Sequence, residues 1–593
     1  MTRDSHDGPT GAAPPAPDRR RWFALVVVLV AGFMDLLDVT IVNVAVPSIL
    51  RDLDAAYAQV EWVITGYLLG FAALLITGGR LGDSFGRKRM FLVGVGGFTV
   101  ASALCGLATT PAVLIGARFF EGAMAGLMVP QILAIIYVTF PPEERGKVLG
   151  LWGGVLGSAS AAGLVAGGLL VRWDLAGLGW RPIFLINVPV GLAAMIAARF
   201  VVRESRSAAA PGLDPIGMVL AVSAVLMLVY PLTEGRSLGW PAWSYGLMAG
   251  SAAVLAGFVA YERRRTRTRS PLVALGLFRA RAFSVGLAVW LIFWVALGGF
   301  FLMWTLYMQV GLGWTPLRAG LTAATFAAGG TAGAGLSVQV LTPLFGRRVL
   351  MAGALVNAAG FGGYAWVAFH YGPAVHPWQM VAPLVGAGFG FGMVVAPMVD
   401  LILSGVPVRD AGAASGVLST IQQVGLALGV ALVGVVFFGL LAGGSGRGVD
   451  AVTPGVRDRL AAVGVPPAGQ EQILAGFRAC VHDRSAATDP TVPPPSCRRV
   501  GAAAPAQVER VLADAGARAN AHNFSRTLGD TLWYAIAILV VVFLGLFALP
   551  RRVRLADPAA ETAGPTADAD GGEPPVPGVP GVPGATRTAR SPR

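Results

Sequence analysis

The chain has 593 residues, of which 55% are hydrophobic and only 13% are charged. An ordinary soluble protein carries about 25% charged residues, so a chain of this length would lack the charged coat that water requires. The composition, with a mean hydropathy of +0.66, excludes a soluble enzyme, a nucleic-acid-binding domain and a disordered scaffold. It predicts a protein that crosses a membrane many times.

Fourteen apolar stretches are each long enough to cross the ~30 Å hydrocarbon layer as a helix. Their length and their lack of period-two alternation argue against membrane-spanning strands. We therefore predict an all-α integral membrane protein with 14 transmembrane helices. No small-residue cleavage site follows the first stretch, so no removed leader is expected. The stretches lie at 23–48, 57–79, 90–109, 112–136, 148–171, 182–202, 215–232, 241–261, 282–308, 317–341, 349–369, 378–403, 411–442 and 529–549.

The positions of the Lys and Arg residues predict the orientation of these helices. With the N-terminus inside, the inside segments carry 28 basic residues and the short outside loops carry five. Both termini are therefore expected in the cytoplasm. The net charge of +13 is then an orientation signal, and no nucleic-acid partner is expected. Arg outnumbers Lys by 43 to 2, which is typical of a GC-rich bacterial genome and predicts a bacterial plasma membrane.

Two segments outside the spans are distinctive. The outside segment 443–528 has helical patterns near 467–479 and 504–520 and a Pro-rich part at 488–495. It also contains Cys480 and Cys497, which an oxidising exterior could join in a disulfide; two free thiols are the alternative. The tail 550–593 is rich in Pro and Gly and is expected to be disordered.

Several chemistries lack the residues that they require. Gly146-Lys147 is followed by Val148, so it is not a P-loop, and ATP is not indicated as the energy source. The glycines of 386–392 lie inside an apolar stretch with no preceding strand. This favours helix–helix contacts over a dinucleotide site. No Cys/His cluster is present, so we expect no metal or other cofactor and no enzymatic activity.

Four ionisable residues lie inside predicted spans, in two pairs with the same spacing. Asp35 and Asp38 are three apart in the first span, and Arg118 and Glu121 are three apart in the fourth. Ionisable groups in a membrane are costly and usually functional. Three carboxyl groups face one guanidinium, and neighbouring carboxylates resist ionising together. The group is therefore a candidate proton carrier. The alternative is a static polar network that fixes helix packing, and whether Asp35 faces a cavity stays open.

The motifs in these regions resemble those of the major facilitator superfamily, and in particular its fourteen-helix drug:proton antiporter branch. The loop 79–89 is similar to the superfamily motif G-x-L-x-D-r-x-G-r-k-x, and 37–47 is similar to the first-span motif L-D-x-T-I-V-N-V-A-L-P of that branch. Arg118 to Gly122 resembles R-x-x-q-G, with Glu121 in place of the commoner Gln. Further matches are Trp62 with Tyr67, Trp180 to Pro189, Tyr307 to Gln309, Pro316 to Gly320, Ser415-Gly416 and Gln422-Gln423.

One motif departs from the family pattern. In the antiporter branch the fifth span reads g-x-x-x-G-P-x-x-G-G, whereas here Leu164 follows Gly163 where Pro is expected. The glycines still allow a neighbouring helix to approach closely. The missing Pro removes a kink from this helix. The motif is therefore weaker support for substrate export in exchange for protons than the other motifs are.

The resemblance implies two six-helix bundles with two inserted helices. The expected boundaries are 1–22 for a cytoplasmic tail, 23–205 for spans 1–6, 206–270 for the inserted spans 7–8, and 271–549 for spans 9–14. A short internal repeat agrees with two matched bundles, because Gly346-Arg347-Arg348 is similar to Gly86-Arg87-Lys88. Such repeats support alternating access around a central site. Within the loop motif, Gly79, Asp83, Gly86 and Arg87 would form a gate in which Asp83 pairs with an Arg or a helix N-terminus. The alternative is that the motif only holds its basic residues inside.

The resemblance further implies a proton-driven exporter of lipophilic or cationic organic compounds, with H⁺ as the coupling ion, working as a monomer in the lipid bilayer. The aromatic ninth span could stack on flat or cationic substrates; packing or lipid contact is the alternative reading. A dedicated exporter of one endogenous metabolite is a second hypothesis. A non-transporting sensor that uses 443–528 is a third. Candidate cavity residues are Asn43, Tyr67, Trp304, Tyr307, Gln309, Gln422 and Gln423.

Overall fold

The computed structural model describes residues 20–55, 57–206, 214–235, 238–265, 273, 275–407, 410–486, 494–502 and 506–549. The chain divides into a compact unit, Met1–Val553, and a second unit, Arg554–Arg593. The second unit and the predicted disordered tail 550–593 lie outside the described residues, as do residues 1–19 of the predicted N-terminal tail.

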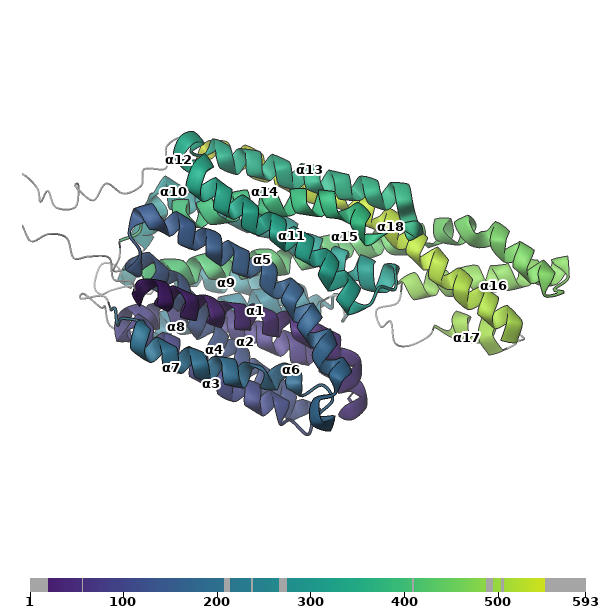
Figure 1. The fold of residues 1–593 in the computed structure, drawn as a ribbon, viewed down its shortest axis with the longest axis horizontal. Coiled ribbons are helices and arrows are strands. Elements are labelled where there is room, and N and C mark those ends of the chain that lie inside the picture. Colours follow the sequence, from purple (N-terminus) through teal and green to yellow (C-terminus); the bar gives the residue numbers. More distant parts are fainter. Residues whose placement is uncertain are drawn as a thin grey trace, which may run out of the picture. The chain divides into compact units, whose positions relative to one another are not determined.

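Throughout the described part of the chain, the regular elements are helices (Figure 1). This confirms the predicted all-α class. The long helices are α1 (Arg20–Asp52), α2 (Tyr57–Phe85), α3 (Arg87–Gly106), α4 (Pro111–Thr139), α5 (Pro142–Trp173), α7 (Asn187–Val201), α8 (Pro215–Glu234), α9 (Ala242–Arg265), α10 (Arg281–Leu306), α11 (Pro316–Leu336), α13 (Arg348–Tyr371), α14 (Pro377–Leu403), α15 (Ala411–Ala462), α16 (Pro467–Ala486) and α18 (Ala506–Gly545). Shorter helices are α6 (Pro182–Leu185), α12 (Thr342–Phe345), α17 (Pro495–Ala502) and the π-helix η3 (Tyr307–Gly311).

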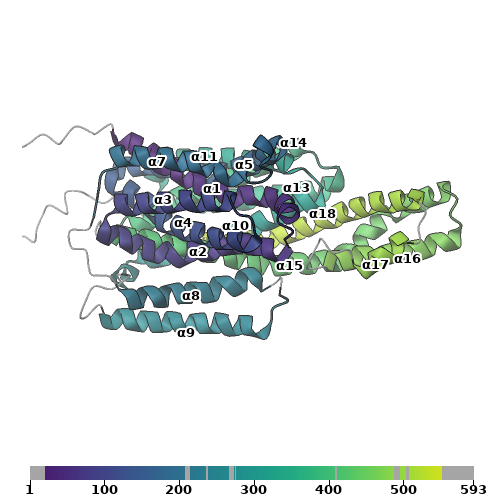
Figure 2. The same cartoon turned by 90° about the horizontal axis from the view of Figure 1, so that it is seen from below.

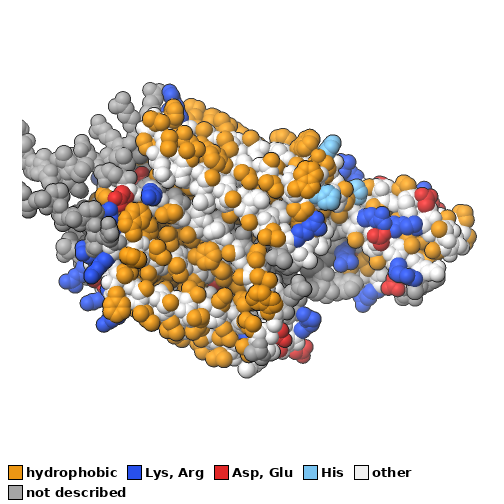
Figure 3. Space-filling view, viewed as in Figure 1, with side chains coloured by type: hydrophobic (Ala, Val, Ile, Leu, Met, Phe, Trp, Pro, Cys, Tyr) orange, Lys and Arg blue, Asp and Glu red, His pale blue; other side chains and the backbone are white. Residues whose placement is uncertain are grey.

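Eleven helices of the described residues are long and apolar enough to span a membrane, or twelve if the bent helix α2 is counted as one span. Fourteen spans were predicted, and this exact count stays a prediction. The two remaining predicted stretches coincide with α5 and α11, which are helical but rich in Gly and Ala and are not among these candidates. Hydrophobic side chains cover the side of the bundle seen in Figure 3.

The helices form two halves with the same internal packing. In the first half α2 packs on α4, α3 on α4, α1 on α5 and α3 on α7; in the second half α11 packs on α14, α13 on α14, α10 on α15 and α13 on α18. Each helix of the first half therefore has a counterpart in the second, with α1, α2, α3, α4, α5 and α7 matching α10, α11, α13, α14, α15 and α18. Figure 1 shows α11, α13 and α14 together on one side and α1 to α4 with α7 on the other.

The two halves meet through two main helix pairs, α2 with α15 and α5 with α11. Under the matching above, each pair is the counterpart of the other. The halves are thus related by an approximate two-fold arrangement, which is the construction of repeat-built transporters.

The short internal repeat in the sequence corresponds to matching local structure. Gly86 and Gly346 both have positive φ, 109° and 55°, a conformation that favours glycine, and each lies at a break between two helices. The Lys88 Nζ donates to the Arg199 carbonyl near the end of α7 at 2.6 Å. In the second half, Arg347 donates to the Phe547 and Leu549 carbonyls after α18 at 2.9 and 2.7 Å. A basic residue of the loop thus caps the last helix of its own half in both halves.

Glycines set the closest helix contacts in both halves. A Cβ at Gly122 of α4 would lie 2.0 Å from the Tyr67 carbonyl oxygen of α2. In the counterpart pair, a Cβ at Gly388 or Gly392 of α14 would lie 2.0 Å from the Phe326 or Gly330 carbonyl oxygen of α11. The glycine run 386–392 of α14 therefore serves helix packing, as predicted, and has no strand before it.

The inserted helices α8 and α9 form a hairpin outside the two matched sets. They pack on each other, and α8 also packs on α2 and α15. Figure 2 shows both helices along one edge of the bundle, with α9 outermost.

The predicted outside segment 443–528 is largely a continuation of its two flanking helices. Helix α15 runs unbroken to Ala462, and α18 already begins at Ala506. These ends, with α16 and α17, enclose a hydrophobic core that includes Val456, Phe477 and Leu512. We call this part the helical extension. On its surface, the side chains of Arg518 and Arg459 donate to Asp514 and hold the pKa of that carboxyl below its usual range.

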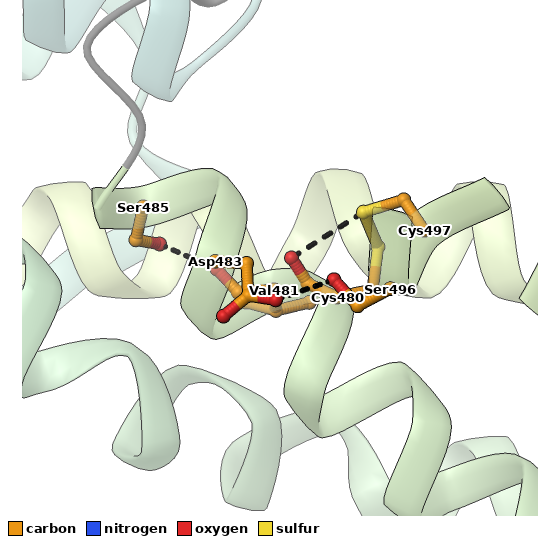
Figure 4. The surroundings of a disulfide bond; sticks show 6 residues. All are labelled: Cys480, Val481, Asp483, Ser485, Ser496 and Cys497. Carbon is orange, nitrogen blue, oxygen red and sulfur yellow. Dashed lines mark hydrogen bonds between the residues drawn. A yellow bond between two sulfur atoms is a disulfide. The ribbon is translucent and has the colours of Figure 1, made fainter. Parts of the chain in front are cut away.

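A disulfide joins Cys480 of α16 to Cys497 of α17 (Figure 4). Beside it the Ser496 hydroxyl donates to Asp483 at 2.6 Å. The remaining cysteine, Cys105, is buried in α3.

We predict that Gly122→Ala lowers the thermal stability of the purified protein, because its Cβ would meet the α2 backbone, which cannot rotate away. Overpacking of this kind costs about 1–3 kcal/mol. Gly116→Ala on the same helix has no atom within 4 Å of its Cβ and is the matched control. Melting of the detergent-solubilised variants, followed by tryptophan fluorescence, checks this; equal midpoints for both variants would contradict it.

Candidate functional site

The four predicted ionisable residues meet in one buried cluster of the first half. Asp38 and Glu121 have no exposed surface, Arg118 is 1% exposed and Asp35 is 5% exposed. They do not face lipid, and five helices supply their surroundings. We call the cluster the buried network; its members are Asp35, Asp38, Tyr67, Ser102, Arg118, Glu121 and Asn187.

Arg118 of α4 is the centre of the buried network. Its Nη1 donates to the Asp38 Oδ2 at 2.5 Å and to the Glu121 Oε2 at 2.7 Å. Its Nε donates to the Val63 carbonyl of α2 at 3.2 Å. The guanidinium also lies 4.3 Å from the centre of the Tyr67 ring, a favourable cation–π distance. One side chain thus connects α4 to α1 and α2.

The remaining oxygens of Asp38 and Glu121 also have donors. The Asn187 amide of α7 donates to the Asp38 Oδ1 at 3.0 Å and to the Ser102 hydroxyl of α3 at 3.1 Å. The Ser102 hydroxyl in turn donates to the Glu121 Oε1. A chain of hydrogen bonds therefore links the two carboxyls by a second route that avoids Arg118.

Asp35 is the member of the buried network that bonds to α2 and not to Arg118. Its Oδ1 accepts a hydrogen bond from the Tyr67 hydroxyl at 2.5 Å. Because the Tyr67 ring also packs against the Arg118 guanidinium, Tyr67 of α2 connects Asp35 to the other members of the buried network. Tyr67 was predicted as a cavity residue, and the structure places it between two ionisable groups.

The buried network holds more acid than base. Three carboxyl groups share one guanidinium, and burying an uncompensated charge is costly. No group of three or more His, Cys, Asp or Glu that could hold a metal occurs among the described residues. The arrangement is suited to exchanging a proton between carboxyl groups.

The sequence predicted the ionisable members but not all their partners. Asn187 appeared only within a family motif, and Ser102 gave no signal, because a serine in an apolar stretch is common. The Asn43 side chain lies outside the described set, and so does that of Leu164.

The predicted gate residues lie where α2 passes into α3. This end of the bundle carries Arg80, Arg87, Lys88 and Arg89, and we call it the basic end. Asp83 is fully buried. Its Oδ1 accepts from the Arg87 Nη2 at 2.6 Å and from the Gly412 N–H at 3.1 Å, and its Oδ2 accepts from the Ala413 N–H at 3.0 Å. Asp83 therefore binds both an arginine and the N-terminus of α15, which belongs to the other half.

Glycines bring the two halves together at the same place. A Cβ at Gly79 would lie 2.2 Å from the Gly412 carbonyl oxygen. A second link between the halves joins α4 and α14, where the Tyr137 hydroxyl donates to the Asp400 carbonyl at 3.1 Å. The halves are thus fastened by polar contacts at Asp83 and Tyr137.

The predicted cavity residues of the second half divide into two groups. Trp304 and Tyr307 are buried and pack among aromatic rings: Trp304 stacks on Phe300 at 5.2 Å, and Tyr307 contacts Tyr364 at 6.3 Å. This favours the packing interpretation of the aromatic span. Gln309, Gln422 and Gln423 are half-buried.

Two matched helical halves with a buried ionisable network define a membrane transporter. The chain belongs to the Major Facilitator Superfamily, whose family profile matches residues 28–430. This confirms the predicted family, and it agrees with the expectation that the chain is not an enzyme.

The comparisons extend to individual proteins. The chain is 41% identical over 549 residues to the "Probable actinorhodin transporter" of Streptomyces coelicolor, covering 92% of this chain and 95% of that protein. It is 36% identical over 441 residues to the "Tetracenomycin C resistance and export protein" of Streptomyces glaucescens, covering 73% and 80%. Among solved structures, the human organic anion transporter MFSD10 superposes with a TM-score of 0.53 at 12% identity, covering 89% of this chain and all of that chain, which supports the fold alone.

We predict that Arg118→Met destabilises the protein strongly, because it leaves buried carboxyls without their cation. Removing one partner of a buried pair costs about 3–5 kcal/mol. Adding Asp38→Asn and Glu121→Gln to that variant removes the unpaired charges and is expected to recover part of the loss. Thermal unfolding of the single and triple variants measures this, and a triple variant no more stable than Arg118→Met would contradict it.

Proposed function

We propose that the protein is a proton-driven exporter of antibiotics or other lipophilic organic compounds that works by alternating access. The relatives named above are a transporter and a resistance and export protein for antibiotics, which supports the substrate class. The observation that carries the proton coupling is the single Arg118 nitrogen shared by Asp38 and Glu121.

The shared nitrogen gives protonation a mechanical consequence. The bond from Arg118 to Glu121 lies within α4, whereas the bond from Arg118 to Asp38 ties α4 to α1. A proton on Glu121 leaves the bond between helices in place. A proton on Asp38 leaves Arg118 with its neighbour in α4 and weakens the hold on α1. Moving one proton between the two carboxyls therefore changes which helices are joined.

The same half carries the gate. Helix α2 contributes Tyr67 to the buried network and Asp83 to the contact with α15. In the proposed cycle, this contact closes the basic end, which the charge count predicts to be cytoplasmic, while the opposite end releases substrate. Inward proton flow then resets the carrier.

The energy available is sufficient for export without ATP. Each 100 mV of membrane potential supplies about 2.3 kcal/mol per charge, which corresponds to roughly a fifty-fold concentration ratio. A dedicated exporter of one compound is the second candidate, because the relative that matches over 92% of this chain carries the name of a single compound.

We predict that Asp38→Asn abolishes proton-coupled efflux while the protein still inserts, because the amide cannot carry the proton. The measurement is the export of a panel of lipophilic dyes and antibiotics by reconstituted vesicles with an imposed pH difference. Asp458→Asn, an exposed change in the helical extension, is the control. Export by Asp38→Asn at the wild-type rate would refute the carrier assignment, and flux indifferent to the pH difference in the wild type would refute the proposed function.

We also predict that Asp83→Asn opens the basic end, since the change removes the charge that binds the α15 N-terminus. Charge–dipole contacts of this kind contribute about 1–2 kcal/mol when partly buried, so labelling of a Ser415→Cys probe by a maleimide should rise roughly ten-fold. Ser415 is buried in α15 next to the Gly79 contact. Glu204→Gln, which alters a carboxyl near the same loop, is the control, and equal labelling in both variants counts against the gate.

A further inference from the structure

Buried carboxyls also lie outside both halves, in the inserted hairpin, and one of them is Glu234. Glu234 ends helix α8 of the inserted hairpin and is 5% exposed. Its Oε1 accepts a hydrogen bond from the Thr65 hydroxyl of α2 at 2.7 Å. A carboxyl in a membrane protein is costly to bury, so its fixed contact with a neighbouring helix calls for a reason.

The contact falls on the turn of α2 that supports the buried network. Val63 accepts from Arg118 through its carbonyl, and Tyr67 donates to Asp35 through its hydroxyl. Val63 and Tyr67 are four residues apart and share one face of α2, while Thr65 lies between them on a different face. A single helical turn is therefore bonded to the network on one face and to Glu234 on another.

Packing holds α8 in register with this turn. The Trp62 ring lies 5.7 Å from the Tyr230 ring of α8, which stacks on Trp243 of α9 at 5.6 Å. Leu69 and Val229 are buried in the same cluster. The position of Glu234 relative to Thr65 is thus set by an apolar contact as well as by the hydrogen bond.

The hairpin is also joined to α2 at the basic end. Arg80 of α2 interacts electrostatically with Glu262 and Asp214 of the hairpin. Asp214 in turn accepts from the Arg265 Nε at 2.9 Å and from the Tyr261 hydroxyl at 2.9 Å. The hairpin thus packs on α2 through α8 and adds negative charge near Arg80, on the helix that carries both Tyr67 and Asp83.

We propose that Glu234 is a positioning residue for proton coupling, which holds the turn 63–67 of α2 so that Tyr67 and the Val63 carbonyl meet Asp35 and Arg118. This inference rests on the proposed role of the buried network as proton carrier. It gives the inserted hairpin a function in coupling that neither six-helix half supplies.

The test compares three variants with a matched control. Glu234→Leu removes the acceptor, Thr65→Val removes the donor, and Glu234→Gln keeps an acceptor oxygen and serves as the rescue. Ser251→Ala is the control, because it removes a buried hydrogen bond to the Ala224 carbonyl within the hairpin without touching α2.

The first readout needs no substrate. Infrared titration of the purified protein follows the carboxyl band that Asp38→Asn deletes. We expect Glu234→Leu and Thr65→Val to move the half-titration pH of that band by about one unit, a roughly ten-fold change in proton affinity. Glu234→Gln and Ser251→Ala should leave it in place. Should Glu234→Leu fail to fold, Thr65→Val carries the comparison.

The second readout is the pH profile of dye export by reconstituted vesicles, which should shift in the same two variants. A folded Glu234→Leu or Thr65→Val protein with the wild-type titration would overturn the positioning role. A shift of equal size in Ser251→Ala would also overturn it, because the effect would then be general loosening of the hairpin. If the wild type shows the titration but no proton-coupled export, the proposed function fails while the positioning role stands.

Discussion

One guanidinium nitrogen connects the two carboxyls at the centre of the first half. The Nη1 of Arg118 serves both Asp38 and Glu121, at 2.5 and 2.7 Å. Because a buried carboxylate without a cation is costly, the protonation of either acid decides where the guanidinium charge is needed. Of the two bonds made by this nitrogen, only the one to Asp38 crosses between helices. In the proposed function, the addition or loss of one proton thus changes how α1 is held.

In the proposed function, the rest of the fold would transmit such a change through closely packed helix pairs. Glycines let α2 and α4 touch backbone to backbone, and the same is true of α11 and α14. Pairs packed this closely move together rather than deform. The halves meet through α2 with α15 and α5 with α11, and polar links at Asp83 and Tyr137 join them as well. In the proposed alternating-access cycle, the contacts between the halves are the ones that would open and close.

The sequence predicted those features that follow from composition and spacing. The apolar stretches gave the helices, and the three-residue spacing of Asp35 with Asp38 and of Arg118 with Glu121 identified the ionisable members of the site. It did not reveal Asn187 or Ser102 as their partners, since bonds across helices depend on how those helices pack. The aromatic residues of α10 were ambiguous for the same reason, because ring composition does not tell packing from substrate contact.

The segment after residue 442 shows a local preference overridden by packing. The predicted span ends at 442, and each glycine after it costs about 1 kcal/mol in a helix, yet α15 continues through them to Ala462. A Cβ at Gly448 would lie 2.5 Å from the Ala519 carbonyl oxygen of α18, and one at Gly444 would lie 2.6 Å from the Asn523 Oδ1. These glycines therefore permit two helices to run side by side out of the bundle.

That continuity connects the two ends of the molecule. Helix α15 begins at the Asp83 contact and, with 52 residues, is about 78 Å long at ~1.5 Å per residue. The same continuous helix therefore contributes backbone N–H groups to the Asp83 contact at its first turn and apolar side chains to the helical extension at its other end. The helical extension is built on that far end and on α18, and its own core and disulfide hold it together. One helix thus links the two ends of the bundle, and the helical extension is held to it by an apolar core, with a disulfide of its own between α16 and α17.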